Sequence, residues 1–302
     1  MMVRTAATYR GVYDALGERK DCSTEDRHVA DQLADVLPGG AAGAKALSGL
    51  LRGFVKRAGR MMIDAEVDQF LECGVDLSLR EPLHDFLQRC SGPSRDTPRV
   101  IYLDDDPAAT AHARTSIGAG NSSTRAALVD HRDPLSAMTA PVDGNREPDS
   151  GKETVRDCLK SEWPIGLIHC GLLPHLGDRS APAMMADLLR RWDVLLPQGS
   201  FIALSHFCVP PSNPPLAAVA AKVEEIFTES ALGAGVFLTP EQFADLFRGH
   251  ALVQPAPGHL REVVPVDRFW PDGPALDRHS AAVAPVLWGG VARKGAPFGL
   301  LG

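Results

Sequence analysis

The sequence of 302 residues lacks the features of several protein classes. It contains no apolar run of about 18 residues, so we expect no membrane-spanning helix and no membrane partner. Residues 1–10 lack the apolar stretch of a signal peptide. The 6 cysteines fall at irregular spacings, which argues against a disulfide framework. We therefore expect reduced thiols and a cytoplasmic protein.

Positive charge is also scarce. The chain has 31 Lys and Arg residues against 38 Asp and Glu residues, a formal net charge of −7. This balance argues against a surface that wraps nucleic acid, so we expect no nucleic-acid partner. Apolar residues make up 44% and charged residues 23%, values typical of globular proteins with a sizeable core.

The first part of the chain has a helical pattern. Capping side chains at 23–26 precede apolar residues at helical spacing that continue to a Pro-Gly-Gly stop at 38–40. A second helix is predicted over 44–62. Its basic side chains form a flank that we expect to be solvated: Lys45, Arg52, Lys56, Arg57 and Arg60.

Beyond residue 68, short apolar runs alternate with amphipathic stretches. The predicted strands are 68–73, 99–104, 125–130, 164–170 and 199–205, and the predicted helices between them are 81–90, 107–117, 181–196 and 216–232. This alternation favours an α/β fold with a doubly wound, mostly parallel sheet. A further helix should start at Thr239-Pro240, and 285–294 should form a late strand that closes the sheet as a hairpin.

Ligands of such sheets bind beyond the carboxyl ends of the strands. Asp104 ends the second predicted strand, where one carboxylate can accept both hydroxyls of a ribose. Its neighbour Asp106 precedes Pro107 and is better explained as a helix cap.

Several segments in one order resemble a known family: VYDALGERKD, FLECG, VIYLDDDPAATAHAR, ALVDHRDP, ALSHF, LTPEQFADLF, VPVDRFWPDGP and LWGGVARK. Over roughly residues 9–294 the chain resembles the actinomycete S-adenosylmethionine-dependent methyltransferases, which have a class I, Rossmann-like fold. The resemblance implies a seven-stranded sheet with an N-terminal helical cap. We expect a cap at 1–64, a Rossmann-like domain at 65–294 and a flexible tail at 295–302.

The resemblance also implies roles for individual residues. The turn that contains Glu72 and Gly74 would hold the methionine part of the cofactor. Asp104 would hold the ribose, and Asp130 with His131 the adenine. Tyr13, Asp14 and Lys20 of the N-terminal segment would fold over the pocket.

The departures from the family pattern point to an altered cofactor site. Asp76 stands where the family has the second glycine of its first loop, at a point where the backbone must approach the cofactor closely. Its carboxylate would repel that of the cofactor by roughly 1–4 kcal/mol at about 4 Å. Arg19 follows Glu18 in place of a glycine-rich turn. We therefore expect S-adenosylmethionine to bind poorly, if at all.

An acidic pocket of this kind favours an amine or amino-acid-like substrate. The first hypothesis is a tailoring enzyme of secondary metabolism in which an amine displaces a leaving group within one molecule and closes a small ring such as an aziridine. The predicted catalytic residues are Asp76, His175, His206 and Lys20, and the predicted substrate-binding residues are Tyr13, Asp14, Arg19 and Glu72.

Two alternatives remain open at this point. The chain could be an active S-adenosylmethionine-dependent methyltransferase, or a non-catalytic methyltransferase-like subunit that supports a protein partner. A thiol nucleophile at Cys73 or Cys170, with His206 as base, is a weaker option. No metal site is expected, because the sequence has neither paired C-x-x-C motifs nor a helical zinc motif.

Overall fold

The apolar runs form the strands of one sheet in the computed structural model. The structure describes residues 7–18, 22–74, 81–93, 95–117, 121–142, 153–176, 181–210, 212–230, 232–271 and 275–295. The strands are β1 (Gln69–Cys73), β2 (Arg99–Asp104), β3 (Thr124–Leu128), β4 (Gly166–Cys170), β5 (Phe201–Phe207), β6 (Ala251–Leu252), β7 (Val264–Pro265) and β8 (Leu287–Arg293).

The strand order is β3-β2-β1-β4-β5-β8-β6, and the short β7 pairs with β8 off this path. β1 to β5 are parallel to one another, and β8 runs antiparallel to β5 and β6. The predicted doubly wound, mostly parallel α/β sheet is confirmed. The late strand predicted at 285–294 is confirmed as β8, which runs antiparallel to the preceding strands β6 and β7. It lies inside the sheet, however, between β5 and β6, so that β6 and not β8 is the last strand on that side.

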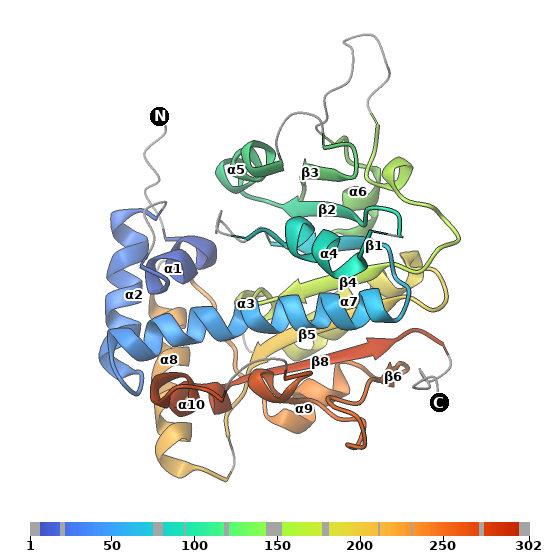
Figure 1. Ribbon diagram of the computed structural model, residues 1–302. Helices are drawn as coiled ribbons and strands as arrows, with labels where there is room; N and C mark the ends of the chain where they lie inside the picture. The colour runs from blue at the N-terminus through green and yellow to red at the C-terminus, as the bar shows by residue number, and fades with distance from the viewer. Residues whose placement is uncertain are drawn as a thin grey trace.

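Helices cover both faces of the sheet (Figure 1). They are α1 (Tyr9–Leu16), α2 (Thr24–Val36), α3 (Ala41–Asp64), α4 (Leu83–Ser91), α5 (Pro107–Ile117), α6 (Pro134–Thr139), α7 (Ala181–Leu195), α8 (Pro214–Glu229), α9 (Pro240–Asp245) and α10 (Arg278–Val283). Successive residues of β2 face opposite layers. Val100 and Tyr102 pack in the core with α3 and α4, and Ile101 and Leu103 pack in the core with α6 and α7.

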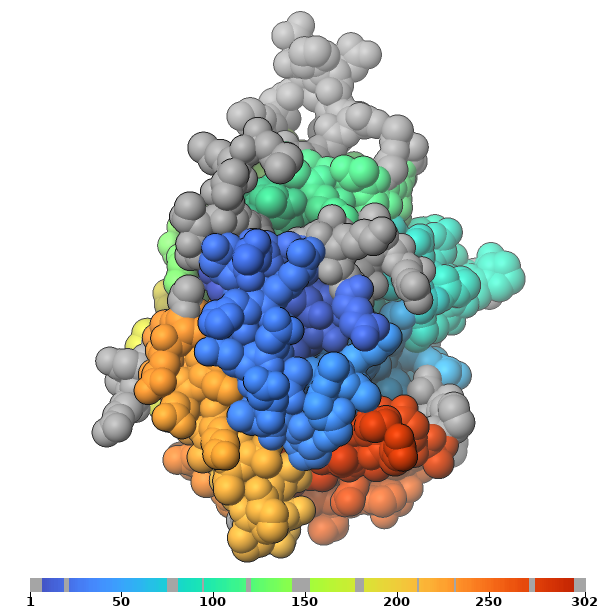
Figure 2. Space-filling view, turned by 90° about the vertical axis from the view of Figure 1, so that its left-hand side faces the viewer, coloured from blue at the N-terminus to red at the C-terminus, as the bar shows by residue number. Residues whose placement is uncertain are grey.

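The N-terminal helices α1 and α2 lie beyond the carboxyl ends of the parallel strands, and the long α3 crosses one face of the sheet (Figure 1). In the view onto this edge, residues of α1–α3 cover the middle of the molecule, between α8 and α10 (Figure 2). The predicted capping signal is confirmed, since Ser23 and Asp26 form a capping box at α2. Asp26 is fully buried and also accepts a hydrogen bond from the Thr8 amide at 2.8 Å, which joins α1 to α2.

None of the helices in the described ranges is long and apolar enough to cross a membrane. The predicted tail at 295–302 lies outside the described residues apart from Gly295.

Candidate functional site

A cavity of about 100 Å³ lies where α1 and α3 meet the carboxyl ends of β1, β2 and β4. Apolar and aromatic side chains dominate its wall, and a few charged side chains interrupt them. The lining includes Tyr9, Tyr13, Asp14, Ser48, Leu51, Arg52, Val55, Lys56, Glu72, Cys73, Gly74, Glu81, Leu83, Tyr102, Cys170 and Leu172.

Gly74 turns the chain at the end of β1. Its φ of 87° lies in the left-handed region that favours glycine. Its amide donates a hydrogen bond to the Leu103 carbonyl at 2.8 Å, and a Cβ at this position would lie 3.0 Å from the Leu172 side chain. The backbone therefore stays bare and close to the cavity, as a cofactor-binding turn requires.

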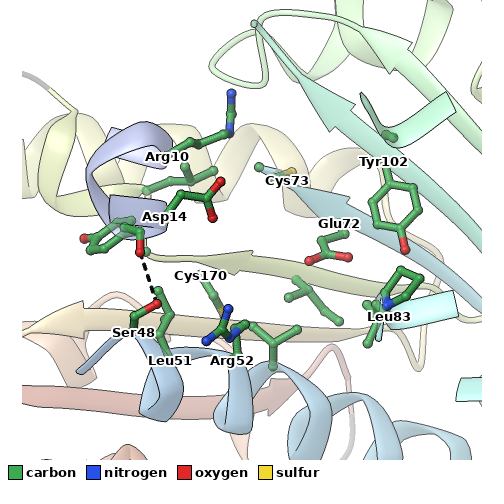
Figure 3. Close-up of a pocket in the computed structure, with 18 of the residues that line it drawn as sticks. Arg10, Asp14, Ser48, Leu51, Arg52, Glu72, Cys73, Leu83, Tyr102 and Cys170 are labelled. Carbon is green, nitrogen blue, oxygen red and sulfur yellow. Dashed lines mark hydrogen bonds between the residues drawn. The ribbon is translucent and has the colours of Figure 1, made fainter. Parts of the chain in front are cut away.

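Two carboxylates enter the cavity from different elements. Asp14 of α1 is 4% exposed and Glu72 of β1 is 5% exposed, and both point into the space between α1, α3 and the sheet (Figure 3). Buried carboxylates in a mostly apolar wall attract a cationic group. Of the predicted substrate-binding residues, the structure brings Tyr13, Asp14 and Glu72 together at this cavity.

The predicted solvated flank of α3 is confirmed for Lys45 and Arg60, which are exposed, and is wrong for its other three side chains. Arg52 and Lys56 line the cavity, and Lys56 pairs with Glu81. Arg57 donates hydrogen bonds to the carbonyls of Val266 and Phe269. The pattern was misinterpreted because helical periodicity does not show that α3 crosses a sheet and so presents a polar side to a cavity.

Asp104, the predicted ribose ligand, is fully buried at the end of β2. Its Oδ1 forms an ion pair with the guanidinium of Arg10 and accepts a hydrogen bond from the Asp106 amide at 2.7 Å. Arg10 belongs to α1, and its guanidinium points away from the cavity (Figure 3). The carboxylate therefore lies at the predicted place but already has a charged partner.

Asp130 and His131, the predicted adenine ligands, follow β3 on the same edge of the sheet. Burial alone would raise the pKa of Asp130, but the hydrogen bonds from Arg132 outweigh it and lower this pKa. Burial lowers the pKa of His131 to about 4, so its ring is neutral. Potential ligand atoms of Asp105, Asp130 and His131 lie within 4.8 Å of one another, but Arg132 already donates two side-chain hydrogen bonds to Asp130.

The predicted catalytic histidines lie outside the cavity lining. His175 contacts the Tyr13 hydroxyl at 3.2 Å and the Ala234 carbonyl at 3.1 Å. His206 is fully buried, with Nδ1 2.7 Å from the Phe207 carbonyl. Burial lowers the pKa of both rings to about 4. The three remaining predicted residues, Arg19, Lys20 and Asp76, lie outside the described residues.

Cys73 and Cys170 both line the cavity. Burial raises the pKa of each thiol far above its ordinary value. A protonated thiol is a poor nucleophile, so the geometry does not favour covalent thiol catalysis.

Sequence reasoning missed Arg10, Ser48 and Tyr102. Ser48 donates a hydrogen bond to the Tyr13 carbonyl at 3.1 Å, and the Tyr102 hydroxyl accepts one from the His84 amide at 3.2 Å. Each lies inside an element whose pattern explains it as ordinary helix or strand, so no local signal marks it.

A family model described as S-adenosyl methyltransferase matches residues 3–295. A crystal structure of a Thermobifida fusca protein, described as a candidate methyltransferase, is 25% identical with a TM-score of 0.75, and the match covers 96% of each chain. A DUF574 family protein from Streptomyces avermitilis is 22% identical with a TM-score of 0.74, over 96% of this chain and 98% of that one. No curated protein matches the chain.

Proposed function

The chain belongs to the S-adenosyl methyltransferase family, and we propose that it transfers a methyl group from S-adenosylmethionine to a small amine-bearing acceptor in the cavity beneath α1 and α3. The observation that carries this proposal is the pair of buried carboxylates, Asp14 and Glu72, on two sides of one largely apolar cavity. Two ammonium groups fit such a wall, that of the methionine part of the cofactor at one carboxylate and that of an amine acceptor at the other.

The side chains at this edge of the sheet have the charges and hydrogen-bonding groups that the cofactor requires. Asp104 and Asp130 follow adjacent strands, where they would receive the ribose hydroxyls and the adenine amino group. At the other end, Glu72 would face the ammonium and Arg52 the carboxylate of the methionine part. When bound, the cofactor supplies an electrophilic methyl group on a sulfonium.

Asp14 is the residue we assign to the acceptor. An amine attacks carbon only as the free base, so its ammonium must lose a proton inside the cavity. Asp14 can orient that ammonium and accept the proton, because its carboxylate is buried next to the space where the acceptor would lie. The apolar neighbours Leu51, Val55 and Leu172 exclude water from the same space.

The test incubates the protein with methyl-labelled S-adenosylmethionine and a panel of primary and secondary amines, including amino acids, beside phenols and carboxylic acids that lack an amine. Mass spectrometry then follows methylated amine and S-adenosylhomocysteine together. Stoichiometric formation of both supports methyl transfer. Turnover restricted to phenols or carboxylic acids would contradict the amine assignment, although it would leave the methyltransferase intact.

A second function is favoured by one observation, the ion pair of Arg10 with Asp104. If this pair persists, the ribose carboxylate is not available, and the cavity would instead catalyse displacement within one amine substrate. Such a reaction forms a C–N bond, breaks the bond to the leaving group and releases the amine proton to Asp14. A ring-closed amine formed without S-adenosylmethionine would establish it.

A further inference from the structure

Arg10 lies at the carboxyl end of β2 in a buried position. It is 6% exposed, and its guanidinium forms an ion pair with Asp104 and donates a hydrogen bond to the Tyr9 hydroxyl. A second carboxylate, Asp105, lies 3.5 Å from Nη1, with its side chain 32% exposed. α1 is therefore held against this edge of the sheet by a charge pair.

A guanidinium and the vicinal hydroxyls of a ribose can bind the same carboxylate in the same way, since both present two hydrogen-bond donors side by side. Oδ1 of Asp104 already accepts from both Arg10 and the Asp106 amide. The side chain is fully buried, so a ribose that used Oδ1 would compete directly with the Arg10 guanidinium for it. The two groups cannot both occupy that position.

We propose that Arg10 and the ribose of S-adenosylmethionine are alternative partners of Asp104, so that Arg10 sets the affinity of the cofactor site and cofactor binding releases α1 from β2. This inference rests on the proposed function. Asp105 offers the displaced guanidinium a carboxylate on the water-exposed side. Because Tyr13 and Asp14 also belong to α1, the exchange at Asp104 moves residues that line the cavity.

The arrangement of Arg10 is not that of an optimised permanent contact. Its Nε is buried and has no hydrogen-bond partner among the described residues. A buried donor without an acceptor costs free energy, so less free energy is lost when this ion pair is exchanged for another set of hydrogen bonds.

The experiment measures binding of S-adenosylhomocysteine by calorimetry to the full-length protein and to Arg10→Met. The variant should bind at least about tenfold more tightly, which corresponds to about 1.4 kcal/mol. Adenosine, which has the ribose but not the amino-acid part, should show the same gain. Arg125→Met is the matched control, because Arg125 is a half-buried residue of the same sheet, paired at 3.7 Å with Glu153. Arg125→Met should bind S-adenosylhomocysteine with the same affinity as the unaltered protein.

Equal or weaker binding by Arg10→Met would overturn the exchange while leaving the proposed function in place. Failure of both proteins to bind S-adenosylhomocysteine would overturn the proposed function itself, and the exchange with it. If Arg10→Met does not fold, hydrogen exchange of the unaltered protein tests whether cofactor binding releases α1. Amides of α1 should change their protection at saturating S-adenosylhomocysteine while those of α7 do not, and unchanged α1 protection would overturn the exchange.

Discussion

The hydroxyl of Tyr13 lies 3.2 Å from Nε2 of His175, and this contact joins α1 to the segment after β4. The other ring nitrogen, Nδ1, lies 3.1 Å from the Ala234 carbonyl. A carbonyl only accepts, so Nδ1 carries a proton; because burial lowers the pKa of the ring to about 4, Nε2 is unprotonated at neutral pH and accepts the hydrogen bond of Tyr13. The neutral ring is thus the form that fits this position.

This arrangement predicts acid lability. Burial lowers the pKa of His131, His175 and His206 from 6.5 to about 4, and it also holds the pKa of His169 well below 6.5. Between these values the unfolded chain binds more protons than the folded one, so stability rises with pH through the window and is lost as the pH falls from 6.5 toward 4. Each histidine contributes at most about 1.4 kcal/mol per pH unit there.

Urea unfolding at several pH values measures the slope, with His175→Gln as the diagnostic variant. This substitution should reduce the slope of the free energy of unfolding against pH by up to the equivalent of one proton. A pH-independent stability between 6.5 and 4 would show that these rings are not held neutral.

Asp26→Ala should detach α1. The Asp26 carboxylate accepts hydrogen bonds from the amides of Thr8 at 2.8 Å and Ser23 at 2.7 Å, and it is fully buried. Losing both should cost about 2–4 kcal/mol and expose α1 to limited proteolysis. Asp277→Ala removes an exposed cap of α10 and should cost about 1 kcal/mol or less. Equal losses in the two variants would argue against a special role of Asp26.

Glu72→Gln and Asp14→Asn should have different effects, the first on binding of the cofactor and the second on transfer of the methyl group to the amine. Glu72→Gln should weaken binding of S-adenosylhomocysteine about tenfold, while 5′-methylthioadenosine, which lacks the amino-acid part, binds as before. Asp14→Asn should lower methylation of the amine about 100-fold or more with little change in cofactor affinity. Calorimetry and turnover with labelled cofactor measure the two effects.

Glu81→Gln is the control for this pair, because Glu81 also lines the cavity, forms ion pairs with Lys56 and Arg89, and has no role in the proposed reaction. It should leave both quantities within about twofold. Identical profiles for Asp14→Asn and Glu72→Gln would contradict the division of roles between α1 and β1.

Gly289→Ala tests how tightly α3 packs on β8. A Cβ at Gly289 would lie 2.5 Å from the Phe54 ring, and Phe54 is fully buried in the core. We expect a loss of about 1–3 kcal/mol in the free energy of unfolding. Gly49→Ala, in the same helix α3 and with nothing within 4 Å of its Cβ, should gain about 0.5–1 kcal/mol. Thermal unfolding distinguishes the two, and a neutral Gly289→Ala would show that α3 can shift.

Local patterns were enough to predict most of the framework. The strand predicted at 99–104 and the helix predicted at 107–117 have the same bounds as β2 and α5, and Asp106 accepts a hydrogen bond from the Ala108 amide as a cap should. These features arise from apolar runs, caps and prolines within one segment, so they survive any tertiary context. The position of β8 inside the sheet could not be predicted, since its partner β5 is far away in the chain.

The sequence by itself determined the alternation of strands and helices, and through its ordered motifs it pointed to Glu72, Gly74 and Asp104 at strand ends. Only the tertiary structure decided what surrounds them. Arg10 and Asp104 are 94 residues apart in sequence, yet they form a buried ion pair. Arg52 lines a cavity, because α3 crosses the sheet. Periodicity within a segment records which side of it is buried, but the partner of a buried charge depends on how distant segments meet.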